Sequence, residues 1–170
     1  VIEAQSDLMT LAIKNKTILI TGAGGSIGSE LCRQAIQHMP KKIVLLEISE
    51  ENLYKINEEL LQINNDKIKI ISILGSSSNF KLVSKTIKDN NIDIIFHAAA
   101  YKHVPIVELN PIEGIKNNIF STVALCQASA ENHIEKLILI STDKSVRPTN
   151  IMGASKRVAE LVVQAYAEKE

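Results

Sequence analysis

Five short apolar segments, each followed by an amphipathic stretch, constrain this chain more than any other feature of its sequence. They are apolar almost throughout, which is typical of parallel strands covered on both faces. The stretches between them carry apolar residues at helical spacing, such as Ile27, Leu31, Ala35 and Met39, which we expect to face the sheet. The order βαβαβαβαβα predicts an α/β fold, a Rossmann-type doubly wound parallel sheet. The predicted strands are 17–21, 42–46, 68–74, 93–97 and 136–141.

A glycine-rich turn follows the first predicted strand directly. Gly22, Gly25 and Gly28 have the spacing G-x-x-G-x-x-G and open the first predicted helix, together with Ser26 and Ile27. The first glycine permits a tight turn, the second lets a diphosphate approach the backbone, and the third lets helix and strand pack closely. The helix N-terminus adds free N–H groups. This strand-turn-helix context favours dinucleotide binding over an ordinary tight turn.

Glu47 follows the second predicted strand, where this fold places a carboxylate that accepts hydrogen bonds from the adenosine ribose. A 2′-phosphate at about 4 Å from it would cost about 4 kcal/mol per unit charge at an effective dielectric of about 20. The loop 48–50 contains no arginine to reverse this preference, although Lys55 could reach round. The sequence therefore predicts NAD rather than NADP. The alternative is a solvated acid at the start of a helix.

Composition excludes several other functions. The 19 lysines and arginines balance the 19 aspartates and glutamates, so no net charge attracts nucleic acid. Cys32 and Cys126 are too few for a disulfide framework, and we expect buried, reduced thiols in a cytoplasmic domain. No apolar run has the length of a membrane-spanning helix. We predict no metal site.

The 170 residues suit one domain. Residues 1–13, with Leu8, Leu11 and Ile13, are expected to form a lead-in helix or linker. Residues 14–170 would form the NAD-binding Rossmann domain, with later helices over 111–132 and 152–167. The substrate-covering part that larger enzymes of this fold carry is not expected within these residues.

Three stretches, at 21–28, 96–110 and 140–157, also resemble a known family. The sequence is similar to the UDP-N-acetylglucosamine 4,6-dehydratases (C6-dehydratases). More narrowly, the sequence resembles the large membrane-anchored branch of these extended short-chain dehydrogenase/reductases, which is used in bacterial polysaccharide and glycoprotein-sugar synthesis. The most specific stretches are Phe96-His97-Ala98-Ala99-Ala100-Tyr101-Lys102-His103-Val104-Pro105 and Ser141-Thr142-Asp143-Lys144. The resemblance covers nearly the whole chain.

The resemblance implies further binding residues. Small residues after the fourth strand would let the cofactor pass, and Lys102 and His103 would lie near the sugar or the nicotinamide. A histidine in a loop is, however, often structural. Asn118 would order the active-site backbone, or else form a helix-helix hydrogen bond. Ser76 stands where related sequences often have an acid near the adenine. The cofactor-binding residues so implied include Gly75, Ser76, Ala98, Ala99, Ala100, Ser141 and Lys156.

The reaction of this family explains the cluster after the fifth strand. Hydride passes from sugar C4 to NAD, and the 4-ketone acidifies the C5 proton. Lys144 is the candidate base for that proton, Asp143 the candidate acid for the departing C6 hydroxyl, and Thr142, or Ser141, would hydrogen-bond the C4 oxygen. Hydride then returns to C6. The alternative for Ser-Thr-Asp-Lys is an ordinary strand-to-loop turn with capping residues.

One position departs from most short-chain reductases. Their Tyr-x-x-x-Lys is replaced by Met152 and Lys156, and a thioether cannot act as an acid or a base. Methionine is itself a feature of the membrane-anchored branch. Met152 would contact the substrate, and Lys156 would bind the nicotinamide ribose and add positive potential. The departure leaves open whether Asp143, Thr142 through a water, or a residue beyond Glu170 removes the C4 hydroxyl proton.

The leading hypothesis is therefore NAD-dependent dehydration of a UDP-linked N-acetylhexosamine. A nucleotide-sugar 4-epimerase shares the fold and the hydride step, but it needs no acid-base pair at Asp143 and Lys144 and normally requires the missing tyrosine. A non-catalytic NAD-binding or oligomerisation module is the third alternative. The resemblance also implies a homo-oligomer and a parent protein anchored at the cytoplasmic face of the inner membrane.

Overall fold

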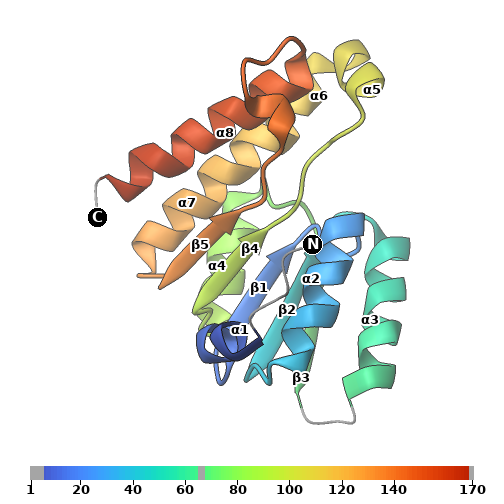
Figure 1. Ribbon diagram of the computed structural model, residues 1–170, viewed down its shortest axis with the longest axis vertical. Coiled ribbons are helices and arrows are strands. Elements are labelled where there is room, and N and C mark those ends of the chain that lie inside the picture. Colours follow the sequence, from blue (N-terminus) through green and yellow to red (C-terminus); the bar gives the residue numbers. More distant parts are fainter. Residues whose placement is uncertain (1–5, 65–67, 169–170) are drawn as a thin grey trace.

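The computed structural model describes residues 6–64 and 68–168 (Figure 1). Five strands alternate with helices in the predicted order. The elements are α1 (Ser6–Ile13), β1 (Thr17–Thr21), α2 (Ser26–Gln37), β2 (Lys42–Glu47), α3 (Glu50–Asn64), β3 (Lys69–Leu74), α4 (Phe80–Asn90), β4 (Ile94–His97), α5 (Val104–Leu109), α6 (Pro111–Ile115), a π-helix (Lys116–Phe120), α7 (Ser121–Glu131), β5 (Lys136–Leu139), a 3-10 turn (Asp143–Ser145) and α8 (Ile151–Ala167).

The five strands form one parallel sheet in the order β3-β2-β1-β4-β5. The prediction of a doubly wound Rossmann-type sheet is therefore confirmed. The chain leaves β3 at one edge and enters β4 on the other side of β1, so the winding direction reverses between β1 and β4. Ligands of this fold bind at the carboxyl ends of the strands at that reversal.

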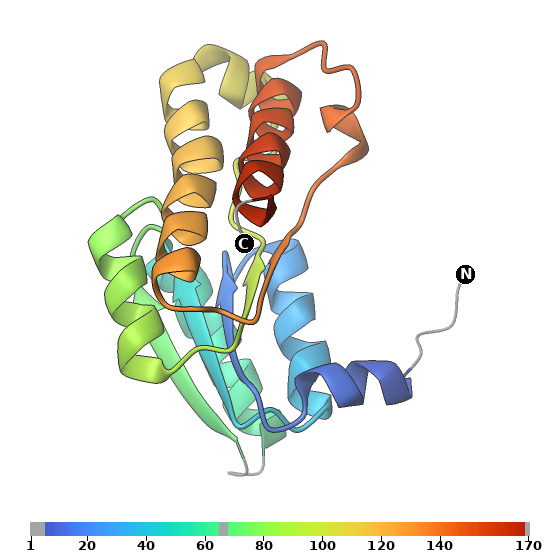
Figure 2. The same ribbon diagram turned by 90° about the vertical axis from the view of Figure 1, so that its left-hand side faces the viewer.

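Helices cover both faces of the sheet (Figures 1 and 2). Ile18 and Ile20 of β1 pack in one apolar cluster with α2 and α3, whereas Leu19 packs in a second cluster with α4 and α7. This division follows from the alternation of side chains along a strand. The fully buried β1 explains why its sequence is apolar throughout.

The apolar stripe predicted on α2 is only partly sheet-facing. Ala35 is buried and Leu31 packs against the core, but Ile27 is 52% exposed and Met39 is 47% exposed. Ile27 lies in the first turn of α2, beyond the end of the sheet, where it lines a cavity. Met39 lies after the end of α2 with φ at 55°.

The single helix predicted over 111–132 is divided in three by a π-helical segment. The hydroxyl of Ser121 donates to the carbonyl oxygen of Asn117, and Thr122 Oγ1 donates to that of Asn118 at 3.0 Å. Such hydroxyl bonds to the preceding turn compete with the regular helical pattern. π-Helical turns occur frequently at functional sites.

The lead-in segment is helical over α1, and the expectation for residues 1–5 lies outside the described residues. Thr10 Oγ1 is 2.8 Å from His38 Nδ1, which ties α1 to the end of α2. None of the described helices is both long and apolar enough to cross a bilayer. Cys32 and Cys126 are buried, as expected, and burial raises the pKa of the Cys32 thiol to about 12.

Candidate cofactor and active site

The glycine-rich turn packs so closely that two of its three glycines have no room for a side chain. Gly22 has φ at 64°, and a Cβ there would lie 2.7 Å from backbone atoms of Ala99. A Cβ on Gly28 would lie 2.0 Å from the carbonyl oxygen of Gly22. At Gly25 the closest described atom would be the same oxygen, at 3.2 Å. Gly22 and Gly28 are therefore required by the fold, whereas the space at Gly25 faces a cavity.

The N-terminus of α2 points its backbone donors into that space. Gly25 is the N-cap residue, and no described side chain caps the helix. The first-turn N–H groups of an α-helix have no partner within the helix and carry the positive end of its dipole. This end of α2 is therefore suited to hold an anionic group.

Glu47 joins the end of β2 to the glycine-rich turn. Its Oε2 accepts from the Gly24 N–H at 3.0 Å, and its Oε1 accepts from the N–H groups of Ile48 at 2.9 Å and Ser49 at 3.0 Å. The side chain is nearly buried and lines a cavity. A carboxylate has about four acceptor positions, so one stays available for a ligand hydroxyl. Glu47 is thus part of the turn's architecture as well as a candidate ribose ligand.

Two cavities meet at the glycine-rich turn and the segment after β4. The smaller, about 250 Å³, is lined by Glu47, Gly75 and Ser76. The larger, about 470 Å³, is lined by Ser26, Ile27 and Gly28 on one side and by residues of the segment 140–156 on the other. Gly25, Ala98 and Ala100 line both. The expected cofactor residues therefore lie along one continuous path across the carboxyl ends of the strands.

His97, at the end of β4, hydrogen-bonds to side chains of β1 and α7 beside these cavities. Ser121 and Thr122 give their hydroxyl protons to backbone carbonyls, so they can only accept from His97 Nε2, at 3.3 and 3.2 Å. Nε2 therefore carries the proton, and Nδ1 accepts from Thr21 Oγ1 at 2.7 Å. Burial, with the charge of Lys156, lowers the pKa of His97 to about 3, so it stays neutral.

Asn118 holds the backbone of the segment after β4. Its Oδ1 accepts from the Tyr101 N–H at 2.7 Å, and its Nδ2 donates to the Tyr101 carbonyl at 3.0 Å and to Ser155 Oγ at 2.9 Å. The sequence left open two roles for Asn118, and the side chain has both: it orders the backbone after β4 and hydrogen-bonds to α8. It does so from the π-helical segment.

The turn after β5 carries the predicted acid-base groups. Thr142 and Lys144 line the larger cavity, together with Ser141. Asp143 is exposed and is not among the described residues that line this cavity, although its Oδ1 accepts from Thr142 Oγ1 at 3.0 Å. The geometry therefore brings Lys144 and Thr142 to the cavity, and Asp143 to the same turn.

Met152 and Lys156 lie on the side of α8 that faces the cavity, and both are buried. Lys156 Nζ donates to the carbonyl oxygen of Ile140 at 2.7 Å. Burial lowers the pKa of Lys156 to about 8, partly offset by the carboxylate of Glu160. A lysine whose pKa lies this close to neutral pH can take part in proton transfer or support a bound cofactor.

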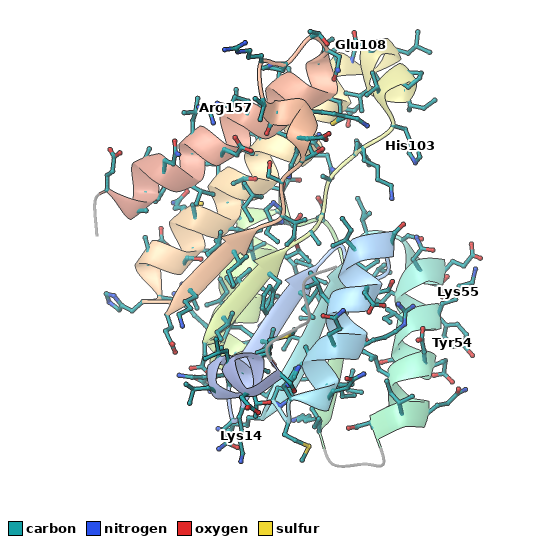
Figure 3. All side chains as sticks on the ribbon, viewed as in Figure 1. Lys14, Tyr54, Lys55, His103, Glu108 and Arg157 are labelled. Carbon is teal, nitrogen blue, oxygen red and sulfur yellow. The ribbon has the colours of Figure 1, made fainter. Side chains whose placement is uncertain are left out.

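Lys102 and His103 occupy different parts of the site. Lys102 Nζ donates to Ser26 Oγ at 3.0 Å, so its charge lies at the glycine-rich turn. His103 is exposed at the start of α5 (Figure 3). It lines both the larger cavity and a neighbouring one. Substrate contact remains a prediction for both, and Lys102 is placed equally well for a diphosphate.

Sequence reasoning missed several residues of the site. A Cβ on Gly24 would lie 2.5 Å from Asn52 Cβ, so this glycine lets α3 approach the turn. Gly153 is similarly restricted, by the carbonyl oxygen of Lys144 at 2.3 Å. The polar His97 at the end of an apolar strand was a sequence signal that could have indicated a buried hydrogen-bonding residue of the site.

No metal-binding group is present within residues 6–64 and 68–168. No three His, Cys, Asp or Glu side chains there form a group that could hold a metal ion.

The parallel sheet, the uncapped helix behind a glycine-rich turn and the paired cavities define a Rossmann-type protein of the dinucleotide-binding class. Sequence comparison narrows the class. The profile of the family described as "Polysaccharide biosynthesis protein" matches residues 18–170, and the chain belongs to this family.

Curated relatives agree with this assignment. The chain is 41% identical over 167 residues to the capsular polysaccharide biosynthesis protein CapD of Staphylococcus aureus, covering 98% of this chain and 28% of CapD. It is 36% identical to the UDP-glucose 4-epimerase of Rickettsia bellii, covering 90% of this chain and 44% of that protein. The chain thus spans less than half the length of either relative.

Solved structures share the fold. The protein Pen from Bacillus thuringiensis superposes with a TM-score of 0.84 at 32% identity, covering 91% of this chain and 47% of Pen. The UDP-glucose 4-epimerase of Bifidobacterium longum, solved in complex with NAD+ and UDP, gives a TM-score of 0.78 at 22% identity, covering 91% of this chain and 50% of that one.

Proposed function

We propose that this chain is the NAD-binding part of an enzyme that converts UDP-N-acetylglucosamine to a UDP-4-keto-6-deoxy-N-acetylhexosamine, for bacterial surface-glycan synthesis. The observation that carries the proposal is a single cavity lined by the glycine-rich turn and also by Thr142, Lys144 and Lys156. Hydride chemistry and acid-base chemistry would then meet in one place.

The described residues fit a dinucleotide. The uncapped end of α2 and the open space at Gly25 suit its diphosphate, and Lys102 adds a positive charge beside Ser26. Glu47 has an acceptor position left for a ribose hydroxyl. Ala98 and Ala100 border both cavities with small side chains. NAD, when bound, supplies the hydride acceptor at sugar C4 and the hydride donor at C6.

The turn after β5 supplies the proton transfers. Lys144 takes the C5 proton, and Asp143 gives a proton to the C6 hydroxyl, which leaves as water when the C5–C6 double bond forms. The hydroxyl protons of Ser141 and Thr142 are used by Glu160 and Asp143, so either hydroxyl can accept a hydrogen bond from the C4 hydroxyl of the sugar. Lys156 adds positive potential beside this oxygen, and Met152 contributes an apolar wall.

A nucleotide-sugar 4-epimerase is the second candidate, favoured by the 36% identity to the Rickettsia bellii enzyme. Met152 argues against it, because epimerases of this fold normally need a phenol there to exchange the C4 hydroxyl proton. A non-catalytic NAD-binding module is the third. Specificity for an N-acetylhexosamine, a homo-oligomeric state and attachment of the complete protein to the cytoplasmic face of a membrane are further parts of the proposal.

Mass spectrometry of the reaction separates these candidates. The complete protein, incubated with NAD and UDP-N-acetylglucosamine, is expected to produce a sugar nucleotide lighter by one water, with no accumulation of NADH, because the hydride returns to the same sugar. An unchanged mass with a new stereoisomer would establish the epimerase instead. No reaction, with NAD still bound, would support the binding module.

Replacing Glu47 with glutamine is expected to weaken the discrimination against NADP. The change removes the charge that repels a 2′-phosphate, and the ratio of the NADP and NAD dissociation constants should fall about tenfold or more. Titration calorimetry with both cofactors measures this ratio. Glu50→Gln, at the exposed start of α3, is the matched control and should leave the ratio unchanged. An unaltered ratio in Glu47→Gln would remove Glu47 from the cofactor site.

A further inference from the structure

Helix α8 contacts the turn after β5 through three residues on one face. A Cβ on Gly153 would lie 2.3 Å from the carbonyl oxygen of Lys144. Lys156 donates to the Ile140 carbonyl at 2.7 Å, and Glu160 accepts from Ser141 and Ser145. Spacings of three and four residues place side chains on the same side of a helix. The segment 140–145 is thus held along its length by one helix face.

Glu160 makes the contacts that connect the two ends of this turn. Its Oε1 accepts from Ser141 Oγ at 2.5 Å and from Ser145 Oγ at 2.6 Å, while its Oε2 accepts from Arg157 Nη1 at 2.9 Å. Ser145 Oγ also lies 2.6 Å from the carbonyl oxygen of Thr142, so its single proton is shared between this oxygen and Glu160. Ser145 is buried, so its hydroxyl has little access to water. Thr142 and Lys144 lie between the two serines that this carboxylate joins.

The carboxylate is charged under working conditions. The hydroxyl donors Ser141 and Ser145, with Arg157, lower the pKa of Glu160 to about 2. Hydrogen bonds to an ionised acceptor are about twice as strong as those between neutral groups. One anion thus holds both serines, which a neutral side chain would do less firmly.

We propose that Glu160 is a positioning residue, which holds the 141–145 turn against α8 through Ser141 and Ser145 so that Thr142 and Lys144 face the cavity. This inference rests on the proposed function for its effect on turnover. Its structural part, the fixing of the turn, can be measured without any substrate.

Replacing Glu160 with alanine in the complete protein is expected to lower kcat about 100-fold, because small displacements of reacting groups cost that much, while the dissociation constant of NAD changes less than about twofold. Glu160→Gln keeps a neutral acceptor oxygen and should recover part of the loss. Arg157→Ala is the matched control. Arg157 contacts the same carboxylate from the outer side of α8, away from the turn, and this variant should behave as wild type (Figure 3).

Hydrogen exchange measures the turn directly. The amides of Ser145 and Val146 donate to Thr142 and Asp143 carbonyls at 3.1 and 3.0 Å, and their exchange should be about tenfold faster in Glu160→Ala than in Arg157→Ala. Unchanged exchange overturns the inference, as does a kcat within twofold of wild type or a fall in kcat matched by equal losses of NAD affinity and thermal stability. If the wild-type protein removes no water, the proposed function fails, and exchange alone then decides whether Glu160 positions the turn.

Discussion

Lys144→Ala and Asp143→Asn are each expected to lower the turnover of the complete protein by at least about 100-fold while NAD still binds normally. Proton transfer by a positioned side chain contributes about 100- to 10,000-fold to catalysis, and each of these residues is assigned one such transfer. Lys144 lines the cavity, and Asp143 shares its turn. The measurements are the rate of water loss from UDP-N-acetylglucosamine and the dissociation constant of NAD.

Val146→Ala is the control for this pair, because Val146 lies in the same loop, is 72% exposed and is not among the described residues that line the cavity. It should keep wild-type turnover. Near-normal turnover in Lys144→Ala or in Asp143→Asn would remove that residue from the mechanism. The two variants also test different steps: Asp143→Asn should retain exchange of the C5 proton with solvent in the presence of substrate and NAD, whereas Lys144→Ala should lose it.

Gly25→Ala should weaken NAD binding, whereas Gly28→Ala should lower the stability of the fold, although both residues belong to the same turn. Gly25→Ala adds a methyl group to the cavity, at 3.2 Å from the Gly22 oxygen, which a small shift relieves. We expect a normally folded protein whose NAD dissociation constant rises about 100-fold, or about 2.7 kcal/mol, because the methyl group occupies the approach of the diphosphate. Calorimetric titration and thermal unfolding together measure both properties.

Gly28→Ala, in contrast, forces a Cβ to within 2.0 Å of the Gly22 oxygen inside the packed junction of β1 and α2. Overpacking of this kind costs about 1–3 kcal/mol, so the melting temperature should fall before any cofactor is added. The pair therefore separates the binding role of the turn from its folding role. If Gly25→Ala binds NAD as well as wild type does, the diphosphate does not lie at this turn.

Much of the candidate site could be predicted from local sequence. The glycine-rich turn, the alanines after β4 and the Thr142–Lys144 turn each follow a strand, and parallel strands bring their carboxyl ends to one edge. Residues that are distant in the chain were thereby expected together. The two cavities contain these groups, with Asp143 beside rather than within the larger one.

Other residues gave no local signal of their contacts. Lys102 lines the larger cavity, and no local pattern indicated that its ammonium donates to Ser26, 76 positions earlier in the chain. Glu160 has the sequence context of an ordinary acidic residue on a helix, and only the structure shows that Ser141 and Ser145 donate hydrogen bonds to it. Ile27 fits a core stripe by spacing, yet α2 extends past the sheet at its first turn, so the side chain borders a cavity instead.

The sequence alone determined the architecture, because strand and helix periodicity acts over a few residues and recurs in each of the five strand-helix units, and the sterics of glycine act locally at the one turn after β1. Tertiary structure alone decided how the site is held: the tautomer of His97, the π-helical turn that carries Asn118, and the carboxylate of Glu160 beneath the turn after β5. The bonds of His97, Asn118 and Glu160 join segments that are distant in sequence, and such bonds are specified by packing geometry that no local pattern encodes.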